Sequence, residues 1–192
     1  MRQIVLPFLA CLTLPACATS QEPAPALAAS EYLGEDRAET AARLFAIAAD
    51  SEGVDEARHE RAVLVLQRLG LKPAEGEADV LTRWSAALPE DRRPPLRGRL
   101  LGPAYRSGVL EPGATLSTNQ LFEGGKKASV SLSGKSKAAL AVQIHDQRER
   151  NVCAPDPGNP RNCRWTPPYS GRYSIKVSNP GEKPVRYFLV IE

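Results

Sequence analysis

The sequence is poor in the residues that most often carry chemistry. Its 192 residues include only two histidines, His59 and His145, and four cysteines. A structural zinc site takes four nitrogen or sulfur ligands, and so few candidates argue against one. The G-x-S-x-G and H-E-x-x-H patterns of two hydrolase classes are also missing. We therefore expect no metal, no cofactor and no catalytic centre of these kinds.

The N-terminal apolar run, from Ile4 to Leu14, is too short to cross a bilayer, which takes about 20 residues. It follows Arg2 and precedes small residues, which is the order of regions in a signal peptide. We expect residues 1–17 to be this signal and residues 18–34, rich in Ala, Pro and Ser, to be a flexible tether. The protein is then an exported bacterial protein, either periplasmic or anchored at the outer membrane.

Two interpretations of the cleavage site remain open. Ala16-Cys17-Ala18 is a small-x-small site for ordinary signal peptidase. Leu14-Pro15-Ala16-Cys17 resembles a bacterial lipobox, in which Cys17 becomes the lipidated first residue, although Pro15 is unusual there. The tether that follows is typical of lipoproteins and favours a lipid anchor on Cys17.

Cys153 and Cys163 are the two cysteines outside the predicted signal peptide, and they enclose the stretch CAPDPGNPRNC. Three prolines and a glycine lie between them, so regular structure would do little to stabilise this loop. An oxidising compartment lets such a pair form a disulfide. The spacing is wider than the C-x-x-C of redox sites, so we expect a structural disulfide worth about 2–3 kcal/mol.

The charges are unevenly distributed. Residues 21–99 hold eleven basic and fifteen acidic side chains, and residues 100–192 hold thirteen and seven. The two halves can therefore attract each other, or the basic half can face an anionic surface. A Pro-rich linker expected at residues 91–107 adds a candidate anion-binding group: Arg92, Arg93, Arg97, Arg99 and Arg106. Cell-envelope glycans, lipid headgroups or the acidic half are the expected partners, and nucleic acid is not expected for an exported chain.

Helical patterns occupy residues 35–90. Asp36-Arg-Ala-Glu39 has the form of a capping box and opens a run to Asp50. Further runs at helical spacing extend over residues 55–69 and 77–88. His59 lies among charged neighbours and is expected on a solvated helix face. About 55 residues form a small core on their own, so we expect this region to dock on the C-terminal half.

A period of two residues follows over residues 108–192. Val130 and Leu132 alternate with serines, and similar alternation recurs around Val142 and Ile175. This pattern predicts half-buried strands. The final run, residues 185–191, is apolar on both faces and is expected to be a central strand. Short strands separated by turn residues favour an antiparallel sandwich or jelly roll, so the whole chain is expected to be α+β.

The order of these turns and strands resembles the bacterial pre-peptidase C-terminal domain. The similarity includes the turn Glu111-Pro112-Gly113, a strand ending at Phe122, and the stretch SGRYSIKV at residues 170–177, which matches a P-G-x-Y-x-x-x-V-type ending. Ser170 stands where the family often has proline, and the cysteine-bounded loop is not a general feature of the family. The resemblance implies a β-sandwich that aids secretion or binds surfaces and polymers, without catalysis.

These patterns together predict a non-catalytic envelope protein whose sandwich binds a surface component or a partner protein. Aromatic side chains at an exposed sandwich face would suit sugar stacking, and the candidates are Tyr105, Trp165, Tyr169 and Phe188. The alternative is a secreted hydrolase, or an accessory to one, that uses the adjacent pair His145 and Asp146 as a base and its orienting acid.

Overall fold

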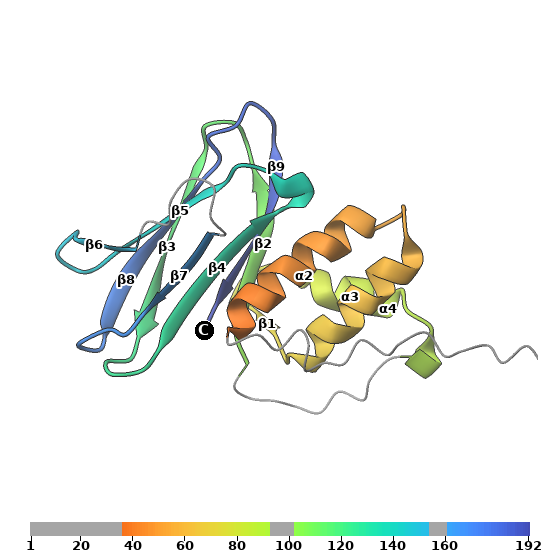
Figure 1. The fold of residues 1–192 in the computed structure, drawn as a ribbon, viewed down its shortest axis with the longest axis horizontal. Helices are drawn as coiled ribbons and strands as arrows, with labels where there is room; N and C mark the ends of the chain where they lie inside the picture. Colours follow the sequence, from red (N-terminus) through yellow and green to blue (C-terminus); the bar gives the residue numbers. More distant parts are fainter. Residues whose placement is uncertain (1–35, 93–101, 154–160) are drawn as a thin grey trace, which may run out of the picture.

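The fold is given by a computed structural model, which describes residues 36–92, 102–153 and 161–192. These residues form three layers: helices, a five-stranded sheet A and a four-stranded sheet B (Figure 1). The expected α+β class, a helical segment followed by an antiparallel β-sandwich, is confirmed. The predicted signal peptide, the tether and Cys17 lie outside the described residues.

The helical layer contains α2 (Arg37–Ser51), α3 (Glu56–Arg68), α4 (Val80–Ala86) and the short 3-10 helix η1 (Glu90–Arg92). Each α-helix begins after an aspartate, Asp36, Asp55 or Asp79, whose side chain accepts backbone N–H groups of the first turn. The cap at Asp79 makes α4 shorter than the run expected from the sequence. None of the described helices is long and apolar enough to cross a membrane.

Sheet A has the strand order β1-β2-β9-β4-β7, and sheet B has the order β3-β8-β5-β6. All pairings are antiparallel except that of β1 with β2. The predicted central strand is confirmed, because β9 lies between β2 and β4. The strand bounds are β1 (Lys72–Pro73), β2 (Ala104–Leu110), β3 (Thr115–Phe122), β4 (Ala128–Gly134), β5 (Ala141–His145), β6 (Asn151–Cys153), β7 (Arg161–Trp165), β8 (Gly171–Ser178) and β9 (Val185–Ile191), with the 3-10 turn η2 (Lys135–Lys137) after β4.

The first strand of the sandwich begins earlier than the sequence suggested. Ala104 and Tyr105 were expected in the linker, yet they pair with β9 on one side and with Lys72 and Pro73 on the other. The sequence did not reveal this pairing because the partner strand β1 is only two residues long and leaves no recognisable period. Because β1 lies between α3 and α4 and pairs with β2, it ties the helical region to the edge of sheet A.

One hydrophobic core lies between the two sheets. It includes Val130, Leu132, Ile144, Ile175 and Leu189, which point inward from both sheets. Trp165 on β7, a candidate for the exposed face, packs on this core instead, since its ring lies 4.8 Å from that of Phe122 and 5.7 Å from that of Tyr173.

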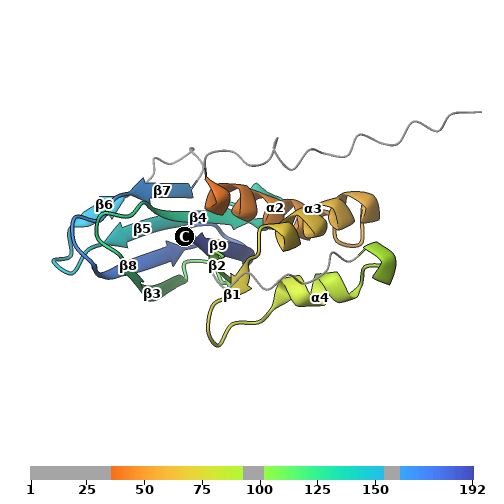
Figure 2. The same cartoon turned by 90° about the horizontal axis from the view of Figure 1, so that it is seen from below.

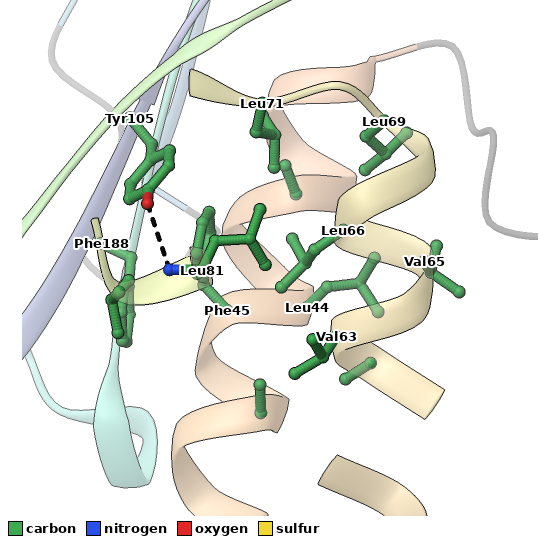
Figure 3. Packing of buried hydrophobic residues seen from close by; sticks show 14 of the residues in the cluster. Leu44, Phe45, Val63, Val65, Leu66, Leu69, Leu71, Leu81, Tyr105 and Phe188 are labelled. Carbon is green, nitrogen blue, oxygen red and sulfur yellow. Dashed lines mark hydrogen bonds between the residues drawn. The ribbon is translucent and has the colours of Figure 1, made fainter. Parts of the chain in front are cut away.

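A second core lies between the helices and the other face of sheet A (Figures 1 and 2). Phe45 on α2 stacks on Phe188 of β9, with ring centroids 5.1 Å apart, and also meets Tyr105 of β2 at 4.7 Å. Figure 3 shows the Tyr105 hydroxyl accepting a hydrogen bond from the backbone N–H of Leu81, and the same hydroxyl donates to Asp79 at 2.7 Å. The expected docking of the helical region on the C-terminal half is thus confirmed, and the rings of Tyr105 and Phe188 are wholly buried.

The serine face of β4 lies under α2. The alternation in this strand predicted a solvated serine side, but β4 is largely buried on both faces. Ser129 donates to Asp36 at 2.6 Å, and Ser133 donates to the backbone carbonyl of Ala42. Small serines opposite the alanine-rich side of α2 allow helix and strand to approach closely. The expectation was wrong because serine is read as polar, whereas its size and hydroxyl fit a hydrogen-bonded contact.

A charged cluster joins the start of α2 to β7. Arg164 donates from Nε to Asp36 and from Nη2 to Glu39, and Asn162 donates to Glu39 at 2.8 Å. Burial tends to raise the pKa of Asp36, but the hydrogen bonds from Ser129, the first helical turn and Arg164 outweigh it and hold that pKa below its usual value. Glu39 therefore contacts the sheet, and its side chain has a role that the capping-box pattern did not anticipate.

The disulfide between Cys153 and Cys163 forms as predicted, with a Cα–Cα distance of 5.8 Å. Cys153 lies on β6 at the edge of sheet B, and Cys163 lies on β7 at the edge of sheet A. The bond therefore links the two sheets along one side of the sandwich. The loop residues between the two strands lie outside the described residues.

Candidate binding surface

The pair His145 and Asp146 is not arranged as a catalytic dyad. Asp146 accepts hydrogen bonds from the backbone N–H groups of Arg148 and Arg150, at 2.8 and 3.0 Å, and from Nε of Arg150 at 2.8 Å. Both carboxylate oxygens are thus held in the turn after β5. Among the described residues, Nδ1 of His145 is buried and has no hydrogen-bond partner. A base needs an orienting acid within hydrogen-bond reach, and this geometry gives the hydrolase alternative no support.

The predicted arginine group is only partly visible. Arg106 lies on β2 and forms an ion pair with Glu77 at 2.6 Å, so its charge is directed at the helical region. This ion pair joins the acidic half of the chain to the basic half, as the distribution of charges led us to expect. Arg92 is the last residue of η1, and Arg93, Arg97 and Arg99 lie outside the described residues. Anion binding by these four arginines stays a prediction.

A pocket of about 340 Å³ opens in the helical layer beside the turn between α2 and α3. Its polar groups are largely paired within the protein: Glu52 accepts from Nε1 of Trp84 at 2.9 Å and pairs with Arg83 and Arg186. His59, expected on a solvated face, is buried here, and its Nδ1 donates to the carbonyl of Ala48 at 2.8 Å. Packing against the edge of Trp84 overrides the charged neighbours of His59 along the chain. The pocket thus offers a ligand few unpaired groups.

The described residues form no candidate metal site. In the parts of the chain that the structure describes, no three side chains of His, Cys, Asp or Glu are grouped so as to hold an ion.

The outer face of sheet B is the sheet surface that neither the helices nor sheet A covers. Side chains point outward from alternate positions of β3, β8 and β5, and most are hydroxyl or amide groups: Thr115, Ser117, Asn119, Gln143, Ser174 and Ser178. The four strands of sheet B contain no aspartate or glutamate, and their two basic side chains, Arg172 and Lys176, form no ion pair with a described residue. We call this surface the open face.

One end of the open face carries exposed apolar groups. Leu121 is 63 % exposed and lies opposite Arg172 on the neighbouring strand, and Tyr169, just before β8, is 82 % exposed. We call these three residues the Tyr169 end. The loop that holds Tyr169 is fixed against the turn after β3, where Gly124 donates to Ser170 at 2.9 Å and a Cβ at Gly124 would lie 2.7 Å from the backbone N of Ser170.

The sequence pointed to Tyr169 only as one of four aromatic candidates. Tyr105 and Phe188 are core residues, and Trp165 is mostly enclosed, so Tyr169 alone of the four has an accessible ring. The sequence did not indicate that Leu121 or Arg172 belongs to a binding surface. From the pattern of a strand alone, a leucine that faces outward cannot be distinguished from one that faces the core.

Comparisons with known proteins give similarity of fold and no family. No family model matches the chain, and no curated protein matches it. Among solved structures, PliG from Aeromonas hydrophila, a periplasmic lysozyme inhibitor of g-type lysozyme, is 16 % identical, with a TM-score of 0.40, over 47 % of this chain and 84 % of its own.

Two further structures show similarity of the same extent. The pre-peptidase C-terminal domain of collagenase from Bacillus anthracis is 15 % identical, with a TM-score of 0.39, over 46 % of this chain and 87 % of its own. The Yersinia pseudotuberculosis-derived mitogen is 13 % identical, with a TM-score of 0.40, over 47 % and 84 %. Similarity at this level concerns the sandwich arrangement and assigns no activity or partner to this chain. Membership of the pre-peptidase C-terminal family stays a prediction.

Proposed function

We propose that this protein is a non-catalytic, exported envelope protein that binds a partner protein through the open face of sheet B, centred on the Tyr169 end. The signal-peptide pattern of residues 1–17 supports export. The disulfide between β6 and β7 supports an oxidising compartment such as the periplasm. A lipid on Cys17 would hold the protein at a membrane while the tether leaves the sandwich free to reach its partner.

The observation that carries the proposal is the unequal covering of the two sheets. Helices cover sheet A, so the open face of sheet B is the broad strand surface left to solvent in the described residues. Proteins seldom keep large apolar side chains exposed without a reason when they lie together. Leu121, which lies opposite Arg172 on β8, and Tyr169, three residues before Arg172, are both exposed at this end of the face.

The side chains of this end suit a protein interface. Tyrosine and arginine are enriched among the residues that contribute most to binding at interfaces. The surrounding hydroxyl and amide groups can form hydrogen bonds at a polar rim. With Arg172 and Lys176 as the only charges on the strands of sheet B, an acidic partner surface is the complementary one.

The experiment compares capture of envelope proteins by three forms of the protein: wild type, Tyr169→Ala and Val54→Ala. Val54 is 83 % exposed and lies in the helical layer, so it is a matched control for loss of an exposed apolar side chain. We expect wild type and Val54→Ala to retain the same partner, identified by mass spectrometry. Tyr169→Ala should lower the affinity for that purified partner at least tenfold. Equal affinity of all three forms would overturn the proposal.

Two further binding experiments distinguish a partner protein from a polysaccharide or a lipid. Cosedimentation with purified cell-wall glycan tests a polysaccharide, and binding to vesicles that contain anionic lipid tests headgroups. Binding to either one that depends on Tyr169 would replace the partner protein in the proposal while keeping the surface. Binding that ignores Tyr169 and disappears in high salt would instead point to the arginines of the linker.

A further inference from the structure

The two sheets have four edges, and three of them are protected. The edge strand β1 is two residues long and includes Pro73. At the other side, β6 is three residues long, its register with β5 shifts near His145, and the disulfide ties it to the edge strand β7. Short strands, proline and irregular register are common means of blocking an edge against pairing with another chain.

The fourth edge, β3, has none of these protections. It is eight residues long and pairs with β8 along its whole length, from Thr115 to Phe122, without a bulge. Its sequence, TLSTNQLF, contains no charge, no proline and no glycine. Charged residues and prolines are the usual way to keep an edge strand from pairing, so β3 is suited to accept another strand.

The backbone groups that face this edge can be assigned. The N–H of Asn179, the residue after β8, donates to the carbonyl of Ala114, so this carbonyl is directed at the β8 side of the strand. Direction alternates along an antiparallel strand, and the groups of every second residue after it therefore point outward to the edge: Thr115, Ser117, Asn119 and Leu121. In agreement, the carbonyl of Leu121 accepts a hydrogen bond from the side chain of Gln120 on the same strand.

We propose that β3 pairs with β3 of a second copy of this chain, antiparallel, about a twofold axis at Thr118. This register places Ser117 opposite Asn119 and Thr115 opposite Leu121 of the other copy. Each of the four edge-directed residues then finds a hydrogen-bonding partner. A twofold axis at Asn119 would leave Thr115 without one, so the register at Thr118 is favoured. The two B sheets become one continuous sheet.

A second copy fits this edge because pairing brings no like charges together. Like charges directly across two strands are destabilising, and β3 has none. The charges on the neighbouring strand are Arg172 and Lys176 of β8, which would be three strand spacings from β8 of the other copy. At about 4.8 Å per spacing this is about 14 Å, beyond the screening length of about 8 Å in physiological salt. Glu123, directly after β3, is paired with Lys126 at 2.7 Å. Pairing would also cover part of the exposed Leu121.

Sedimentation of the purified protein over a concentration series tests the proposal. We expect a reversible dimer in the wild type. The double substitution Ser117→Lys with Asn119→Lys places lysines opposite each other in the proposed register and should weaken the dimer at least tenfold. The control, Ala141→Lys with Gln143→Lys, adds the same two charges at the same spacing to β5, away from the edge, and should change the dimer constant less than twofold.

A charge reversal tests the register. Ser117→Lys combined with Asn119→Glu places opposite charges across the two strands and should restore the dimer to within about threefold of wild type. Hydrogen exchange adds a readout that needs no variant: the amides of Ser117 and Asn119 should exchange more slowly in concentrated than in dilute protein. The urea midpoint of each variant verifies that it folds.

Three results would overturn the proposal: a wild type that stays monomeric at every concentration, a dimer that the edge lysines leave intact, or a charge reversal that does not restore it. Slow exchange at Ser117 and Asn119 that needs a foreign partner, with no self-association, would assign the edge to that partner and overturn pairing between copies. Because Tyr169→Ala leaves β3 unchanged, dimer formation and partner binding can fail independently.

Discussion

The hydroxyl of Ser129 on β4 donates a hydrogen bond of 2.6 Å to the carboxylate of Asp36, the residue that caps α2. One side chain therefore both starts a helix and attaches it to the sandwich. We predict that Asp36→Ala lowers the free energy of unfolding by about 2–4 kcal/mol, because it removes a cap and leaves the hydroxyl of Ser129 and Nε of Arg164 without their acceptor. Urea denaturation followed by circular dichroism measures the change.

Asp55→Ala is the control for this substitution. Asp55 caps α3 in the same way, but its bond to the backbone of Arg58 is exposed and it touches no strand. We expect a loss of about 1 kcal/mol, the usual value for a cap alone. Equal losses for the two aspartates would show that the contact of Asp36 with the sheet adds nothing.

Acid should weaken the protein partly through Asp36. The pKa of Asp36 is raised by burial but lowered further by its hydrogen bonds, so it is lower in the folded than in the unfolded chain. Below about pH 4 the unfolded chain therefore binds more protons, and stability falls as the pH falls. We predict that the urea midpoint drops between pH 5 and pH 3, and that it drops less in Asp36→Asn. Parallel curves for the two proteins would contradict this.

The disulfide should stabilise the side of the sandwich where β6 meets β7. We predict that Cys153→Ala with Cys163→Ala lowers the free energy of unfolding by about 2–3 kcal/mol, since the bond closes a short loop and links the two sheets. Reduction of the wild type should have the same effect, and reduction of the double variant none. Hydrogen exchange should become faster in β6 and β7 while α2 and α3 are little changed.

The hydroxyl of Tyr105 on β2 holds the start of α4, where it contacts both Asp79 and Leu81. Tyr105→Phe keeps the ring against Phe45 but leaves Asp79 and the N–H of Leu81 without this partner. We predict a loss of about 1–3 kcal/mol in the free energy of unfolding. Burial and the neighbouring carboxylate of Asp79 raise the pKa of Tyr105 well above its usual value. In an absorbance titration, Tyr105 should therefore ionise only as the protein unfolds, and Tyr105→Phe should remove that component.

Much of the fold could be predicted because its signals are local. The capping box at Asp36 predicted the start of α2, helical spacing over residues 55–69 predicted α3, and the two-sided apolar run of residues 185–191 predicted a central strand. The disulfide also followed from the sequence, since Cys153 and Cys163 were the pair outside the signal peptide. In each case the relevant residues lie within a few positions, or their chemistry restricts the partner to one choice.

The candidate surface was less accessible to such reasoning. Alternation in β3 and β8 shows two faces to each strand, but it does not show which sheet the helices will cover. Tyr105 and Tyr169 are the same residue type in similar local settings, yet one is wholly buried and the other 82 % exposed. The difference depends on α4 and Phe45, which come from elsewhere in the chain.

The sequence by itself determined the class of fold, the cap of α2, the central strand and the cysteine pair, because periodicity and residue chemistry act over short distances. Only the tertiary structure decided that serines of β4 lie beneath α2, that His59 is enclosed, and that sheet B keeps an open face and a free edge at β3. These features depend on contacts between separate elements of the chain; Ser129 and Asp36, for example, are 93 positions apart. Whether a side chain there is buried depends on how two surfaces fit together, and the sequence of one segment does not specify the shape of the other.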